Sequence, residues 1–173
     1  MHLAASMEVG VEGRELWVDG QRYRVKGVCY SPVPIGENPT YPPFGDYFTP
    51  EFAYIWQRDL PMIKAMGANT VRIYGWNSKV DHTKFLDQLH LNGLKAFITF
   101  YLGISAQNPV RWPEQRQKII EEFKTQARDE PMSCSQVEKY ADHPAVLMWS
   151  FGNELNGPWN GFMGELSGEM AER

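Results

Sequence analysis

An asparagine and a glutamate stand side by side just after an apolar segment of the chain. Residues Val146–Phe151 are apolar almost throughout, and Gly152, Asn153 and Glu154 follow them. Parallel-strand enzymes hold their catalytic groups where strands end at the carboxyl side. A carboxyl group there, next to an amide that can hydrogen-bond a sugar hydroxyl, is what glycoside cleavage requires of its proton donor. The competing interpretation is an ordinary strand followed by a polar turn.

Other predicted strands also end in polar or aromatic residues. The first strand ends in Tyr30 and Ser31, the second carries Arg72, Tyr74 and Trp76, and the third carries Thr99 and Tyr101. Each group alone is ambiguous: Arg72 could belong to a structural ion pair, and the tyrosines could pack at the rim. Similar chemistry at the ends of four strands favours one shared site.

The elements that would position these groups alternate along the chain. Short β-rich runs around Asp19-Gly20 predict a hairpin over about residues 14–25. Strands are expected at 26–32, 69–74, 94–100 and 146–151. Helices are expected at 49–67, 84–92, 112–128, 135–141 and 162–173, the first with Thr49 as N-cap and Gly67 as its end. The long aromatic-rich loop 33–47 is expected to be functional.

Alternation of strands and helices predicts an α/β fold built from parallel β/α units. No glycine-rich nucleotide motif follows a strand, which disfavours a doubly wound sheet. We expect a (β/α)8 TIM-barrel type with only its first four units, a half-barrel preceded by the hairpin, with residues 1–173 as one domain and the barrel units over about 25–173. The inner face is expected to hold the side chains of Val28, Val71, Ile73, Ile98, Phe100 and Leu147.

Composition narrows the function classes. The 173 residues carry a net charge of −4 with scattered Lys and Arg, which argues against a nucleic-acid partner. Cys29 and Cys134 have no metal or redox spacing, and no metal or cofactor is expected. No apolar run approaches the roughly 18 residues of a membrane span, and no signal peptide is evident at the start. Aromatic residues make up 13%, which suits stacking on sugar rings.

Several segments resemble a known family. Lys26-Gly27-Val28, Asn69-Thr70-Val71-Arg72 and the run from His143 to Glu154 resemble the retaining (β/α)8 glycoside hydrolases of clan A. Within that clan, Arg58-Asp59-Leu60-Pro61 and the segment to Arg72-Ile73-Tyr74 are most similar to β-1,3-glucanosyltransferases, which remodel cell-wall glucan. The resemblance covers roughly residues 23–160.

The resemblance implies roles for individual residues. Glu154 matches the general acid/base, Asn153 matches the residue that binds the 2-hydroxyl of the sugar under attack, and Arg72 matches the arginine that supports the nucleophile. It implies an oligo- or polysaccharide partner and a secreted or cell-wall protein. Aromatic residues expected to line the sugar subsites are Tyr30, Tyr74, Trp76, Tyr101 and Trp159.

The sequence departs from the family in one respect. The clan takes its nucleophile from the seventh strand, and a complete barrel needs about 250 residues. We therefore expect residues 1–173 to be inactive alone and to self-associate through exposed strand edges. One alternative is a non-catalytic carbohydrate-binding or structural half-barrel. Another is a (β/α) enzyme of unrelated chemistry, such as a metal-dependent aldolase, which would need His, Asp or Glu ligands at several strand ends, where only Glu154 is found.

Overall fold

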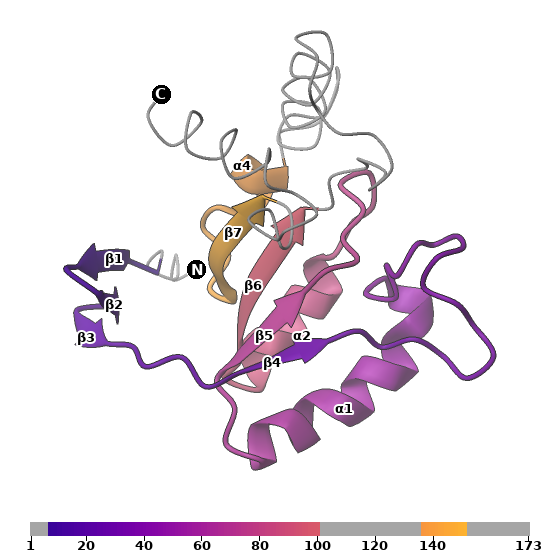
Figure 1. The fold of residues 1–173 in the computed structure, drawn as a ribbon, viewed down its shortest axis with the longest axis horizontal. Coiled ribbons are helices and arrows are strands. Elements are labelled where there is room, and N and C mark those ends of the chain that lie inside the picture. The colour runs from indigo at the N-terminus through magenta and orange to yellow at the C-terminus, as the bar shows by residue number, and fades with distance from the viewer. Residues whose placement is uncertain (1–6, 101–135, 152–173) are drawn as a thin grey trace, which may run out of the picture.

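The computed structural model describes residues 7–100 and 136–151, which form two separate sheets. An antiparallel sheet has the order β1 (Val9–Glu12), β2 (Glu15–Val18) and β3 (Gln21–Arg22). A parallel sheet has the order β4 (Gly27–Tyr30), β5 (Thr70–Ile73), β6 (Lys95–Phe100) and β7 (Val146–Phe151). The antiparallel sheet stands apart from the parallel one, to the left in Figure 1.

The predicted hairpin is present around Asp19-Gly20. Both residues have positive φ, 51° and 71°, as a type I′ turn requires. The Asp19 carboxylate also accepts the backbone N–H of Glu8 at 3.0 Å, which fixes a third strand, β1, that the sequence did not predict. The Tyr23 hydroxyl then donates to the carbonyl of Asn69 at 2.9 Å and ties this sheet to the start of β5.

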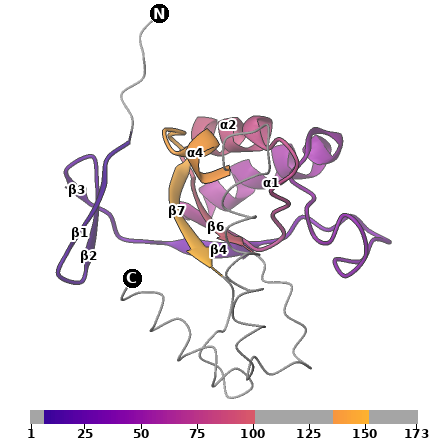
Figure 2. The same ribbon diagram turned by 90° about the horizontal axis from the view of Figure 1, so that it is seen from above.

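The described helices cover a single face of the parallel sheet (Figure 2). They are η1 (Pro50–Phe52), α1 (Ala53–Ala65), α2 (Thr83–Leu91) and α4 (Gln136–Tyr140). The helix expected from Thr49 begins as the 3-10 turn η1, and Thr49 makes no side-chain capping bond. Gly67, with φ of +92°, follows its last turn as predicted. The helices expected at 112–128 and 162–173 lie outside the described residues.

The hydrophobic core lies between the sheet and these helices. Alternate strand residues, among them Val71, Ile73 and Ile98, join Trp56 and Phe85 of the helices in one buried cluster. We expected Val28, Val71, Ile73 and Ile98 on the inner face, which would look into a barrel. That expectation was wrong, because these residues lie on the face that the helices cover. Since strand residues alternate between faces, the opposite face carries Cys29, Arg72 and Thr99. We call this opposite face the inner face.

Two segments of the family resemblance hold β4 in place. The Asn69 side chain accepts the Lys26 N–H at 2.8 Å and donates to the Arg24 carbonyl at 2.8 Å, which secures the start of the strand. Asp59 of α1 accepts the Tyr30 hydroxyl at 3.1 Å, which secures its end. These motif residues therefore position β4, the strand that pairs with β5.

Candidate active-site cleft

Arg72 occupies the centre of the inner face. In the register of the sheet it lies beside Cys29 of β4 and Phe97 of β6. Its guanidinium carbon is 4.7 Å from the ring centroid of Tyr74 and 5.2 Å from that of Phe97. Its Nε donates to the Thr99 hydroxyl at 3.4 Å. Stacking on two rings holds the planar cation in a fixed orientation, so it presents a permanent positive charge to this face.

Tyr74 lies on the same side, just past the end of β5. Its hydroxyl is 3.1 Å from the Cys29 sulfur, and its ring stacks on Arg72. Arg72 and Tyr74, which the sequence analysis named separately as site residues, thus lie in contact at the carboxyl end of the sheet. An aromatic ring and a cation at this edge suit the binding of a polar ligand with a flat face.

Tyr30 points the other way, toward the helices. It is 8% exposed, and its hydroxyl donates to Asp59. Burial, followed by the neighbouring Asp59 charge, raises the pKa of this phenol. Because the ring belongs to the core between β4 and α1, we do not retain Tyr30 as a subsite residue.

The Trp76 side chain is buried against its neighbours and is not an exposed ring. It is 6% exposed and stacks on the ring of His82 with centroids 3.8 Å apart. Its other ring contacts are edge-on, with Tyr140 at 6.0 Å and Trp149 at 6.1 Å. It borders the cleft described next but offers little free surface for stacking on a sugar.

A cleft of about 710 Å³ opens where β4 and β5 end. Its walls are the loop between β4 and η1 and the loop between β5 and α2. This volume falls in the range of about 300–1,000 Å³ typical of small-molecule sites. The lining residues include Ser31, Phe44, Asp46, Tyr74, Trp76 and Asn77.

Asp46 and His82 join the two loops beneath the cleft. The His82 Nε2 lies 3.0 and 2.9 Å from the two Asp46 carboxylate oxygens, and both side chains are buried. Asp46 also accepts the backbone N–H of Asn77 at 3.0 Å. Nearby, Gly75 lies directly against the Gly45 backbone, where a β-carbon would collide. These contacts hold the two loops of the cleft together, and we call the Asp46–His82 pair the brace.

The brace continues to α4 through backbone and side-chain bonds. The His82 N–H donates to the Tyr140 hydroxyl at 2.8 Å, and that hydroxyl donates to Asp81 at 3.0 Å. Lys139 also donates to Asp81, at 2.6 Å. Mainly because of Lys139, the pKa of Asp81 falls to about 2.

The contact between Asp46 and His82 was not predicted from the sequence. A lone Asp and a lone His, separated by 36 residues, carry no recognisable spacing. The glycine before Asp46 and the glycine before Trp76 were the available signals, since close backbone approach requires glycine.

Four predicted site residues lie outside the described residues: Tyr101, Asn153, Glu154 and Trp159. The same holds for Cys134. Within the described ranges, no group of three or more His, Cys, Asp or Glu side chains is placed to hold a metal ion. The helices of those ranges include none long and apolar enough to cross a membrane.

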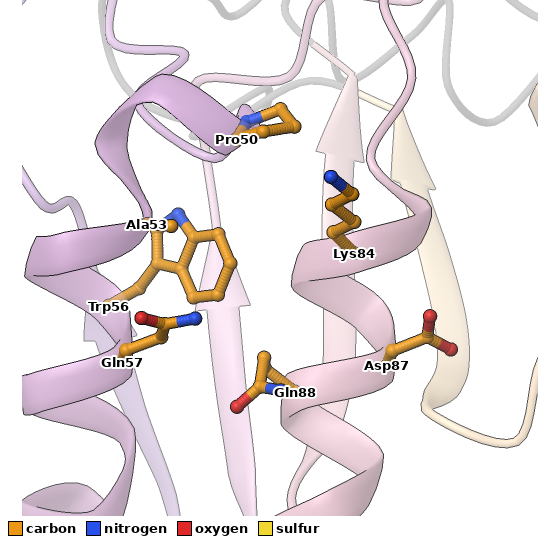
Figure 3. A pocket seen from close by; sticks show the side chains of 7 residues that line it. All are labelled: Pro50, Ala53, Trp56, Gln57, Lys84, Asp87 and Gln88. Carbon is orange, nitrogen blue, oxygen red and sulfur yellow. The ribbon is translucent and has the colours of Figure 1, made fainter.

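A smaller hollow of about 240 Å³ lies between α1 and α2 (Figure 3). Trp56 and Gln57 line one side, and Lys84, Asp87 and Gln88 line the other. It opens between the helices of the covering layer, so its side chains are separate from those of the inner face.

Comparison with known proteins identifies the family. Residues 3–160 match the family described as glucanosyltransferase. The chain belongs to this family. It is 33% identical over 136 residues to the 1,3-beta-glucanosyltransferase GAS5 of Saccharomyces cerevisiae, covering 79% of this chain and 25% of that protein. It is 28% identical over 88 residues to the 1,3-beta-glucanosyltransferase PGA4 of Candida albicans, covering 50% of this chain and 18% of that protein.

Solved structures of Gas2p share the fold. Saccharomyces cerevisiae Gas2p in complex with laminaripentaose aligns with a TM-score of 0.56 at 17% identity, covering 83% of this chain and 30% of that one. Gas2 in complex with compound 10 gives the same values. The chain spans a quarter or less of the length of the curated relatives it matches. The predicted α/β fold with a parallel sheet and the predicted family are both confirmed.

Proposed function

We propose that this chain carries the acid/base part of a retaining β-1,3-glucan transglycosylase, with Glu154 as general acid and base. The observation that carries the proposal is Arg72, stacked on Tyr74 at the carboxyl end of β5 on the inner face. The family match supports it because it includes Asn153 and Glu154. The names of the relatives state 1,3-beta-glucanosyltransferase activity, and one Gas2p structure holds laminaripentaose.

The reaction is a double displacement. A carboxylate attacks the anomeric carbon while Glu154 gives its proton to the glycosidic oxygen, so the bond to the leaving sugar breaks. An acceptor hydroxyl then attacks the same carbon and returns its proton to Glu154, which frees the nucleophile. With water as acceptor the same steps give hydrolysis.

Other residues take supporting roles in this proposal. The Arg72 cation would favour the ionised form of a nearby carboxylate nucleophile. Asn153 would bind the sugar 2-hydroxyl, where hydrogen bonds strengthen in the transition state. Tyr74, Tyr101 and Trp159 would contact the glucan, and Trp76 would support the wall behind it.

We further propose that β4–β7 are the first half of a (β/α)8 barrel and that the nucleophile lies on a later strand, outside residues 1–173. Within the described residues, β4 and β7 each pair with one neighbour. Further strands would complete the sheet, and residues 1–173 made alone would self-associate through these edges. The Glu154 carboxyl would then lie about 5–5.5 Å from the nucleophile.

The test compares transfer of laminaripentaose by an enzyme with the complete barrel and by its Glu154→Gln variant. We expect a loss of about 10²–10⁴ in kcat, with Glu165→Gln as a matched control that retains activity. Residues 1–173 alone should release no aryl group from a chromogenic β-glucoside. Glucan binding that survives Glu154→Gln, with no turnover by any preparation, would favour the non-catalytic sugar-binding alternative. Turnover by residues 1–173 would place the nucleophile within them.

A further inference from the structure

Phe44 has a backbone conformation that bulky residues rarely adopt. Its φ is 55°, in the left-handed region, and the residue is 67% exposed. It belongs to the long loop between β4 and η1, whose course Figure 1 shows. Glycine would fit this position without strain. Burial does not account for a phenylalanine here, since most of the ring faces solvent. Strained residues held by their surroundings cluster at ligand-binding sites.

The residues on both sides of Phe44 hold it in this conformation. Its backbone N–H donates to the Tyr41 carbonyl at 2.6 Å and closes a turn. The next two residues are fixed as well, because Gly45 packs against Gly75 and Asp46 bonds to His82. The Asp46–His82 pair therefore also holds the backbone next to Phe44 in place.

The surroundings of the ring indicate the chemistry of a ligand. Phe44 lines the 710 Å³ cleft and stacks on no other aromatic ring among the described residues. The same cleft presents the Ser31 and Ser78 hydroxyls and the Asn77 amide nitrogen, none of which is hydrogen-bonded within residues 7–100 and 136–151. Its charged lining residue, Asp46, is buried and committed to the brace.

These features fit a neutral ligand with a flat apolar face and a polar edge. An ionic ligand would find no available counter-charge in this lining, and a purely apolar ligand would strip water from the hydroxyls and amide without replacing their hydrogen bonds. A pyranose ring has the required combination: axial C–H groups on its face and hydroxyls around its edge.

We propose that Phe44 is a specificity-determining residue of the glucan site, on whose ring one glucose unit of a β-1,3-glucan stacks. The choice of β-1,3-glucan rests on the proposed function, whereas the sugar-like character of the ligand rests on the cleft itself. The stack would explain why an aromatic residue stands where glycine would be unstrained.

The test measures binding of laminaripentaose to residues 1–173 by calorimetry. We expect Phe44→Leu and Phe44→Gly each to raise Kd about tenfold, equivalent to about 1.4 kcal/mol, and Phe44→Tyr to bind like the unmodified chain. Phe44→Gly should leave the melting temperature unchanged or higher, because it relieves the backbone strain. Tyr54→Leu is the matched control: Tyr54 is 66% exposed on α1, away from the cleft, and its loss should leave Kd unchanged.

The outcomes separate the two proposals. If the unmodified chain binds laminaripentaose and Phe44→Leu binds it equally well, Phe44 has no role in binding while the proposed function stands. If the unmodified chain binds none, the assignment of Phe44 fails, whereas the proposed function is decided by the Glu154→Gln comparison in the complete barrel. A fall in melting temperature for Phe44→Gly would identify Phe44 as a structural residue and overturn its assignment to the ligand.

Discussion

The Asp46 carboxylate and the His82 ring form a buried pair, with Nε2 at 2.9 and 3.0 Å from the two carboxylate oxygens. The pair joins a residue of the loop after β4 to the residue that precedes α2. Trp76 stacks on the face of this histidine ring. The histidine therefore contacts both the loop residue Asp46 and the tryptophan that borders the cleft. The cleft therefore depends on residues that a ligand need not touch.

Replacing Asp46 by Ala should unfold or loosen both loops. The change leaves the His82 Nε2 and the Asn77 N–H without their acceptor, and the buried His82 nitrogen left unpaired costs about 1–3 kcal/mol. Urea denaturation should show this loss of unfolding free energy, and Asp142→Ala is the control because Asp142 is exposed and makes no such bond. Equal stability of the Asp46 and Asp142 variants would contradict a bracing role.

Gly75→Ala should separate the same two loops by a different route. A β-carbon at position 75 would collide with the carbonyl group of Gly45 and would lie 2.9 Å from the Cα of Gly45. Overpacking of this kind costs about 1–3 kcal/mol, so the melting temperature and glucan binding should both fall. Gly10→Ala is the control, since nothing lies within 4 Å of the added carbon. A Gly75 variant indistinguishable from it would show that the loops can move apart freely.

The order of the elements was predictable because local signals specify it. The apolar run Val146–Phe151 became β7 with the predicted bounds, and Asp19-Gly20 became the predicted turn. The α1 helix ends before Gly67 as its left-handed backbone requires. In each case a few adjacent residues carry the information.

We predicted wrongly which strand side chains point to the inner face, and the error has a physical reason. In β5, Val71 and Ile73 alternate with Arg72, and the sequence cannot tell which side the helices cover. Because the helices pack through apolar contacts, Val71 and Ile73 lie on the side that the helices cover, and Arg72 lies on the inner face. The Asp46–His82 brace was likewise beyond prediction, because it depends on how two loops meet.

Tyr30 and Tyr74 should respond in opposite ways to removal of their hydroxyls. Tyr30→Phe loses the bond to Asp59 on the helical side, so we expect a loss of about 1.5–3 kcal/mol in unfolding free energy and unchanged glucan affinity. Tyr74→Phe alters the inner face, so we expect weaker laminaripentaose binding and little change in stability. Calorimetry and urea denaturation on both variants test the pair. Weakened binding by Tyr30→Phe would restore that residue to the subsite.

Asp81 should make stability depend on pH in the acid range. The hydrogen bond from Lys139, with smaller contributions from Thr83 and Tyr140, lowers the folded-state pKa of Asp81 to about 2, against about 3.9 in an unfolded chain. The folded state therefore binds this proton less readily than the unfolded state. The stabilisation is complete above about pH 4 and is lost as pH falls toward 2.

Asp81→Asn should remove that part of the acid dependence. Melting temperatures of the variant and the unmodified chain, measured from pH 6 to pH 2, should differ most at pH 6 and converge at low pH. The absolute size is reduced by solvent, because the Asp81 side chain is 56% exposed. Asp142→Asn serves as the control, with a curve parallel to that of the unmodified chain. Curves for Asp81→Asn that stay parallel down to pH 2 would mean that the Lys139–Asp81 bond does not stabilise the attachment of α4.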